Sequence, residues 1–114
     1  MGNFYIELKQ TLQTVLDWSE SFKKGYRNYK FDIDDELFKL SEKHRKNFQA
    51  GDLLLIYNLL DFYCDAIKHD FDNIDINYSL GQARSDIKSV IDEIGKNSEI
   101  NLPHVLKERL KNLC

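Results

Sequence analysis

The sequence predicts an all-α protein, an up-and-down helical bundle of four long helices plus a short C-terminal helix. Apolar residues recur at three- and four-residue intervals along four stretches, the spacing that gathers them on one helical face. Single glycines and acidic, turn-forming segments separate these four stretches. We recognise no run with the period of two that is typical of a strand. Short connections favour antiparallel neighbours, and 114 residues fit one domain, residues 1–114.

The first helix is expected over residues 3–24. Asn3 is a suitable N-cap, and Gly25 suits the left-handed backbone that often follows a helix C-terminus. Its apolar positions are Phe4, Leu8, Leu12, Val15, Phe22 and Tyr26.

The second helix is expected to begin in the acidic cluster at residues 32–36, because acidic side chains stabilise a helix N-terminus. We expect it to continue as one helix to Gly51, which would end it. Its apolar stripe consists of Leu37, Leu40, His44 and Phe48.

The third helix is expected from Asp52, as N-cap, to Phe71. It is apolar around most of its circumference, which predicts burial on several sides and a central position in the bundle. Residues 72–77 are expected to form a turn, and a fourth helix is expected to start near Leu80 and to stop at Gly95. A short helix with Pro103 in its first turn follows, with an apolar face of Val105, Leu106, Leu110 and Leu113.

Charge and composition exclude several classes of protein. The formal net charge is −3, with nine residues of each sign through Tyr57 and seven basic against ten acidic residues after it. A surface of this kind lacks the broad positive field that nucleic-acid binding requires. No uncharged stretch is long enough for a membrane span, and two isolated cysteines, Cys64 and Cys114, indicate free thiols of a reducing compartment. We therefore expect a cytoplasmic location, with neither nucleic acid nor membrane as partner.

Enzyme motifs are weak, and we expect no catalytic residue, no metal and no cofactor. Glu42 and His44 are two residues apart and lie on different helical faces, whereas Asp65 and His69 are four apart and form a polar ridge with Asp61. Zinc and calcium sites need ligands at characteristic spacings, which the candidate residues here lack. The candidates are Cys64, His69, His104 and Cys114 for zinc, and Asp70, Asp72 and Asp75 for calcium. Cys64 lies in an apolar helix, where cysteine is usually inert. A metal- or thiol-dependent enzyme would need His69 or His44 to meet carboxylates of another helix.

The remaining hypothesis is a non-enzymatic protein-binding module, such as an adaptor, a small chaperone or an immunity-type neutraliser. Tyrosine and arginine are enriched at interface hot spots, and one loop combines them, so the candidate partner-binding residues are Tyr26, Arg27, Tyr29 and Phe31. Tyr29 and Phe31 could instead fold down over the bundle end. The amphipathic C-terminal helix could cap the core or contact a partner, and the broadly apolar helices leave room for a homodimer.

Overall fold

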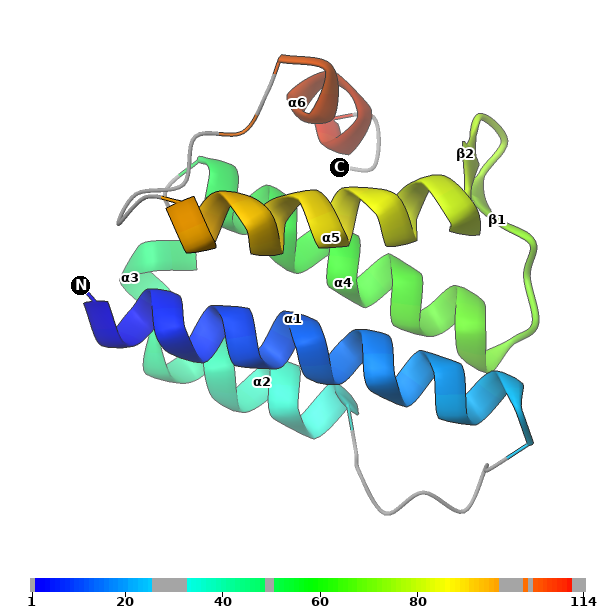
Figure 1. Ribbon diagram of the computed structural model, residues 1–114, viewed down its shortest axis with the longest axis horizontal. Helices are drawn as coiled ribbons and strands as arrows, with labels where there is room; N and C mark the ends of the chain where they lie inside the picture. The colour runs from blue at the N-terminus through cyan, green and yellow to red at the C-terminus, as the bar shows by residue number, and fades with distance from the viewer. Residues whose placement is uncertain (1, 26–32, 49–50, 97–101, 103, 112–114) are drawn as a thin grey trace.

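The computed structural model is a bundle in which the long helices follow one another in alternating directions (Figure 1). It describes residues 2–25, 33–48, 51–96, 102 and 104–111. The predicted all-α class is confirmed. In chain order the elements are α1 (Gly2–Lys23), α2 (Ile33–Lys43), α3 (Arg45–Phe48), α4 (Asp52–Lys68), β1 (Asn73–Asp75), β2 (Tyr78–Ser79), α5 (Leu80–Lys96) and α6 (His104–Lys111).

Helix α4 occupies the centre of the bundle, as its broad apolar circumference predicts. It contacts α1, α2, α3, α5 and α6. Four of its large side chains are completely buried: Ile56, Leu59, Leu60 and Tyr63. Helices α1 and α5 bury matching stripes against it, with Leu8, Leu12 and Val15 on α1 and Ala83, Ile87 and Val90 on α5.

Helix α6 caps the core rather than offering its whole apolar face to solvent. Leu106 and Leu110 are buried, together with Leu102 in the segment before the helix. Val105, by contrast, is 59% exposed. The capping alternative for the C-terminal helix therefore holds for the leucines that the structure describes.

The second predicted helix is interrupted, because α2 ends at Lys43 and α3 begins at Arg45. At the break, the His44 ring contacts α1, where its centroid lies 4.5 Å from that of Phe4. This tertiary contact outweighs the local preference for a continuous helix. The predicted cap at Asp52 also shifts by one residue, because Gly51 is the N-cap of α4 and adopts a left-handed backbone with φ 50°.

The predicted turn at residues 72–77 lies within a short β-hairpin over residues 73–79, which the sequence analysis did not predict. Strands β1 and β2 are antiparallel, pairing Asn73 with Ser79 and Asp75 with Tyr78. The strands have three and two residues, which is shorter than most strands in globular proteins. The hairpin projects at the end of the bundle where α4 stops and α5 starts (Figure 1).

Candidate functional site

The C-terminal half of α4 and the hairpin that follows it carry several exposed acidic side chains. Segment 61–79 holds five aspartates against one lysine, whereas the rest of the chain holds 15 basic and 14 acidic residues. Segment 61–79 thus has a formal charge of −4, the same as the shorter acidic cluster at residues 32–36. We call the solvent-facing part of segment 61–79 the acidic face, made by Asp61, Phe62, Asp65, His69, Asp70, Phe71, Asp72 and Ile76.

Helical geometry lines up the α4 part of the acidic face. Asp61, Asp65 and His69 follow one another at intervals of four residues, so each lies about 6 Å further along the axis on one side of the helix. All three are exposed. Among the described residues they do not form a metal-binding group with a further His, Cys, Asp or Glu, the kind of geometry that a metal-dependent enzyme built on His69 would need.

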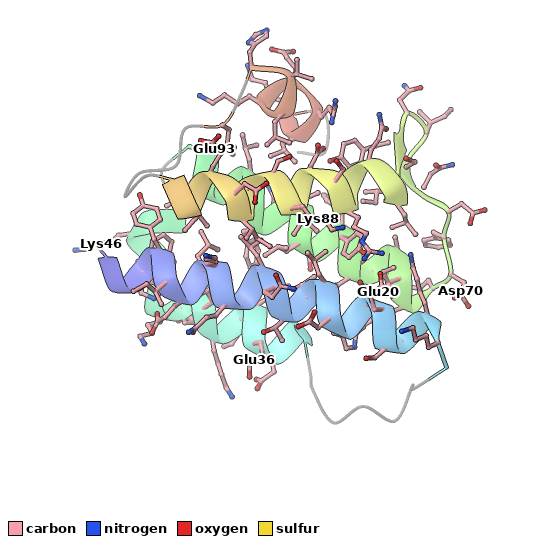
Figure 2. All side chains as sticks on the ribbon, in the orientation of Figure 1. Glu20, Glu36, Lys46, Asp70, Lys88 and Glu93 are labelled. Atoms are coloured by element: carbon pink, nitrogen blue, oxygen red, sulfur yellow. The ribbon has the colours of Figure 1, made fainter. Side chains whose placement is uncertain are left out.

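Apolar side chains lie among these charges. Phe62 is 38% exposed, and Phe71 is 57% exposed with its ring centroid 5.9 Å from that of His69. Figure 2 shows Asp70 at the end of the bundle where α4 leads into the hairpin. Ile76, in the hairpin turn, is 91% exposed. The acidic face therefore combines negative charge with large apolar side chains that are open to contact.

The hairpin that carries Ile76 is anchored in the core by Tyr78. This tyrosine is buried, and its hydroxyl donates a hydrogen bond to the carboxylate of Asp86 on α5. Burial, followed by the hydrogen bond to the Asp86 carboxylate, raises the pKa of Tyr78 above its ordinary value. The phenol therefore stays protonated and remains a donor.

Asp86 connects this anchor to α6. Its other carboxylate oxygen accepts a hydrogen bond from the guanidinium of Arg109, with an N–O distance of 2.7 Å. Asp86 is only 4% exposed, and burying a carboxylate is costly unless it is paired. The Tyr78, Asp86 and Arg109 network therefore supplies that pairing and holds the hairpin base, α5 and α6 together.

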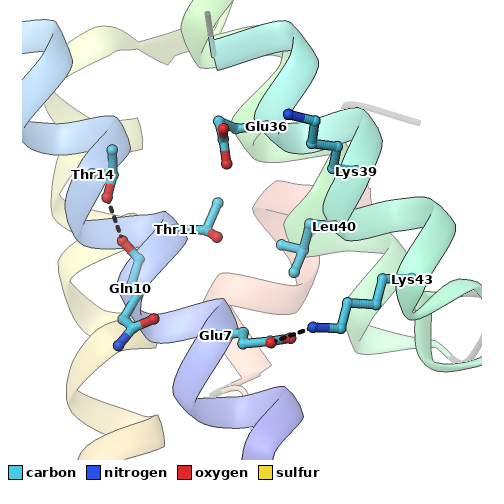
Figure 3. Close-up of a pocket in the computed structure, with 8 residues that line it drawn as sticks. All are labelled: Glu7, Gln10, Thr11, Thr14, Glu36, Lys39, Leu40 and Lys43. Atoms are coloured by element: carbon cyan, nitrogen blue, oxygen red, sulfur yellow. Dashed lines mark hydrogen bonds and ion pairs between the residues drawn. The ribbon is translucent and has the colours of Figure 1, made fainter. Parts of the chain in front are cut away.

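A second surface feature is the groove between α1 and α2 (Figure 3). It encloses about 320 Å³, and its lining residues include Glu7, Thr11, Glu36 and Leu40. The Glu7 carboxylate bridges the two helices, because it lies 2.6 Å from Lys43 Nζ and 2.5 Å from His44 Nε2. His44 thus does meet a carboxylate of another helix, but this carboxylate is already held by Lys43, so the contact is explained as an interhelical tie.

This tie predicts a pH-dependent contribution to stability. Hydrogen bonds from Lys43 and then His44 hold the pKa of Glu7 below its ordinary value of 4.5. Because the folded-state pKa is lowered, the contribution is present above pH 4.5 and is lost as the pH falls through the folded-state pKa. Glu7→Gln should therefore be less stable than the wild type at pH 7, and this difference should shrink below pH 4.5 in urea unfolding curves.

Glu36→Gln is the matched control, because Glu36 lines the same groove without an ion pair among the described residues. Its stability relative to the wild type should change little across that pH range. A difference between Glu7→Gln and the wild type that persists unchanged at low pH would contradict the role assigned to Glu7.

The other candidates from the sequence are placed as follows. Tyr26, Arg27, Tyr29 and Phe31 lie outside the described residues, as does Cys114. Cys64 is in no disulfide among the described residues and is 1% exposed in the core. In the described part of the chain, no three His, Cys, Asp or Glu side chains converge as a metal ion would require.

Sequence reasoning recognised the aspartates of the acidic face in separate pieces and did not join them into one candidate site, although a signal for it was present. Averaging charge over the two halves of the chain conceals the local excess of aspartate in segment 61–79. The contact between Glu7 and His44 had no comparable signal, since 37 residues separate the two.

No protein-family model, curated protein or solved structure matches this chain. Across the described ranges, none of the helices has both the length and the apolar character of a membrane span.

Proposed function

We propose that this protein is a non-enzymatic protein-binding module, an adaptor, small chaperone or immunity-type neutraliser, that contacts its partner through the acidic face. The observation that supports this function is the exposure of Phe62, Phe71 and Ile76 in a segment that also holds exposed aspartates. Exposed apolar side chains scattered singly need no explanation, but a group of them rimmed by polar residues is typical of an interaction site.

The anchoring of the hairpin supports the same proposal. Binding is weakened when a surface must be ordered as the complex forms, so a surface held in place beforehand binds more tightly. Tyr78 fixes the strand that follows Ile76 through its buried hydrogen bond to Asp86. The apolar side chain at the hairpin turn is thereby presented on a structured support.

Affinity capture with the purified chain from lysate of its source organism tests the proposal. The double variant Phe71→Ala/Ile76→Ala should lose one stoichiometric protein partner that the wild type retains, because each exposed side chain that anchors an interface contributes about 1 kcal/mol or more. Circular dichroism should show an unchanged fold, since both side chains are exposed.

The matched control is Phe38→Ala/Val105→Ala, which removes side chains that are 60% and 59% exposed elsewhere on the surface. This control should retain the partner. If both double variants retain it equally, the acidic face is not the contact surface. In that case a third variant, Tyr26→Ala/Tyr29→Ala, tests the loop predicted from the sequence.

A cytoplasmic location and the absence of catalysis belong to the same proposal. The absence of a disulfide at the buried Cys64, among the described residues, supports a reducing compartment. The exposure of Asp65 and His69 supports a non-catalytic role for the polar ridge. Light scattering of the purified chain separates the alternative of a structural homo-oligomer, which would give a discrete dimer mass and no other partner.

A further inference from the structure

We infer that the docking of α6 controls the order of the β-hairpin, so that this C-terminal helix regulates how Ile76 is presented to a partner. The regulatory consequence rests on the proposed function, whereas the coupling between α6 and the hairpin rests on one shared carboxylate. One oxygen of Asp86 accepts a hydrogen bond from the Tyr78 hydroxyl of β2, and the other accepts one from the Arg109 guanidinium of α6. Two separate elements are therefore attached to the same buried side chain on α5.

The hairpin depends on this attachment because it is very short. Its strands have three and two residues, and a two-stranded hairpin by itself is only marginally stable in water. Of the hairpin residues whose burial the structure describes, only Tyr78 is buried, and Ile74 is partly buried against the core. Weakening the contact at Tyr78 should therefore let the hairpin open, and Ile76 at its turn would lose its support.

Arg109 stabilises the attachment by compensating the charge of Asp86. Asp86 is 4% exposed, and a buried carboxylate is disfavoured unless a cation and hydrogen bonds replace the water that it has lost. When α6 undocks, the carboxylate keeps the Tyr78 hydroxyl but loses the guanidinium. Water can restore the lost compensation once the Tyr78 side chain moves out. Undocking of α6 therefore favours opening of the hairpin.

Helix α6 is suited to control the hairpin because its own order depends on docking. It has eight residues, and an isolated helix of that length is marginal in water. It packs on α4, with Leu106 and Leu110 buried, and Arg109 adds the ion pair to Asp86. Because coupling between two sites is reciprocal, a partner that holds the hairpin in place should also strengthen the docking of α6.

Hydrogen–deuterium exchange of the full chain, read by mass spectrometry over residues 72–80, measures opening of the hairpin without any partner. Arg109→Met should raise the exchange rate there about tenfold or more, because it leaves a buried carboxylate without its cation. Arg109→Lys retains a cation and should give a smaller increase. Tyr78→Phe should in turn raise the exchange rate of α6, since the coupling acts in both directions.

Three further variants separate this coupling from a general loss of stability. Leu59→Ala weakens the whole bundle without touching the shared carboxylate, so it should raise hairpin exchange less than Arg109→Met does. Lys111→Met, at an exposed position of α6, should leave hairpin exchange unchanged. Adding Asp86→Asn to Arg109→Met removes the buried charge and should slow hairpin exchange again.

The coupling is overturned if Arg109→Met and Lys111→Met give the same hairpin exchange, or if Leu59→Ala raises it as much as Arg109→Met. A partner captured by the wild type should bind Arg109→Met more weakly than Lys111→Met, because only molecules with an ordered hairpin are competent to bind. Equal affinity for the two variants would overturn the regulatory role. If the wild type captures no stoichiometric protein, the proposed function and the regulatory role fall, while faster hairpin exchange in Arg109→Met still supports the coupling itself.

Discussion

Leu59→Ala should lower the free energy of unfolding by about 2–5 kcal/mol, because it deletes a fully buried side chain from the centre of the core. Leu59 lies near the middle of α4, the helix that contacts α1, α2, α3, α5 and α6. Neighbours on so many sides cannot all move inward to fill the space, so a cavity should remain and add to the lost transfer free energy. Urea unfolding followed by circular dichroism measures this loss.

Leu54→Ala is the matched control on the same helix. Leu54 is 44% exposed, so its removal should cost less than about 1 kcal/mol. A loss below about 1 kcal/mol for Leu59→Ala would contradict the central position of α4.

The helical part of the fold was predictable from the sequence because its determinants are local. The three- and four-residue spacing of Leu8, Leu12 and Val15 places them on one face, and all three are fully buried. Gly25 marks the end of α1 and adopts φ 96°, a backbone conformation that glycine reaches without strain. Neither inference depends on where distant parts of the chain lie.

Two features of the fold were harder to predict from local sequence pattern: the interruption of the helix after α2, and the formation of the hairpin. His44 leaves the helical run at a contact with residues of α1, and no pattern within residues 33–48 reports that contact. The hairpin did have a signal, because Ile74, Ile76 and Tyr78 alternate with polar residues. Of these three side chains only Tyr78 is buried, so the alternation does not correspond to a strand with one face in the core.

The candidate site was predictable only in pieces. Its aspartates were recognised separately, as a polar ridge on the helix and as an acidic turn, and each piece alone is typical of a solvated surface. The ring contact between His69 and Phe71 joins the helix end to the following segment, and this step required the structure. The loop holding Tyr26 and Tyr29 stays a prediction.

Arg109→Met should lower the free energy of unfolding by about 3 kcal/mol, because it leaves the buried carboxylate of Asp86 without its cation. This is at the lower end of the range for a broken buried pair, since the Arg109 side chain is 37% exposed and water can reach its position. Methionine retains much of the aliphatic packing, so the loss reports mainly on the charge. Lys111→Met, at an exposed position on the same helix, should change stability by less than about 0.5 kcal/mol.

A double-mutant cycle with Asp86→Asn separates the unpaired charge from lost packing. In the Arg109→Met background, Asp86→Asn removes the buried charge and should recover part of the stability, whereas in the wild-type background it should destabilise. Tyr78 can still donate to the amide oxygen, so the hairpin anchor persists in the double variant. If the two losses simply add in urea unfolding, Asp86 and Arg109 act independently, and the network that ties the hairpin to α6 is not a stabilising unit.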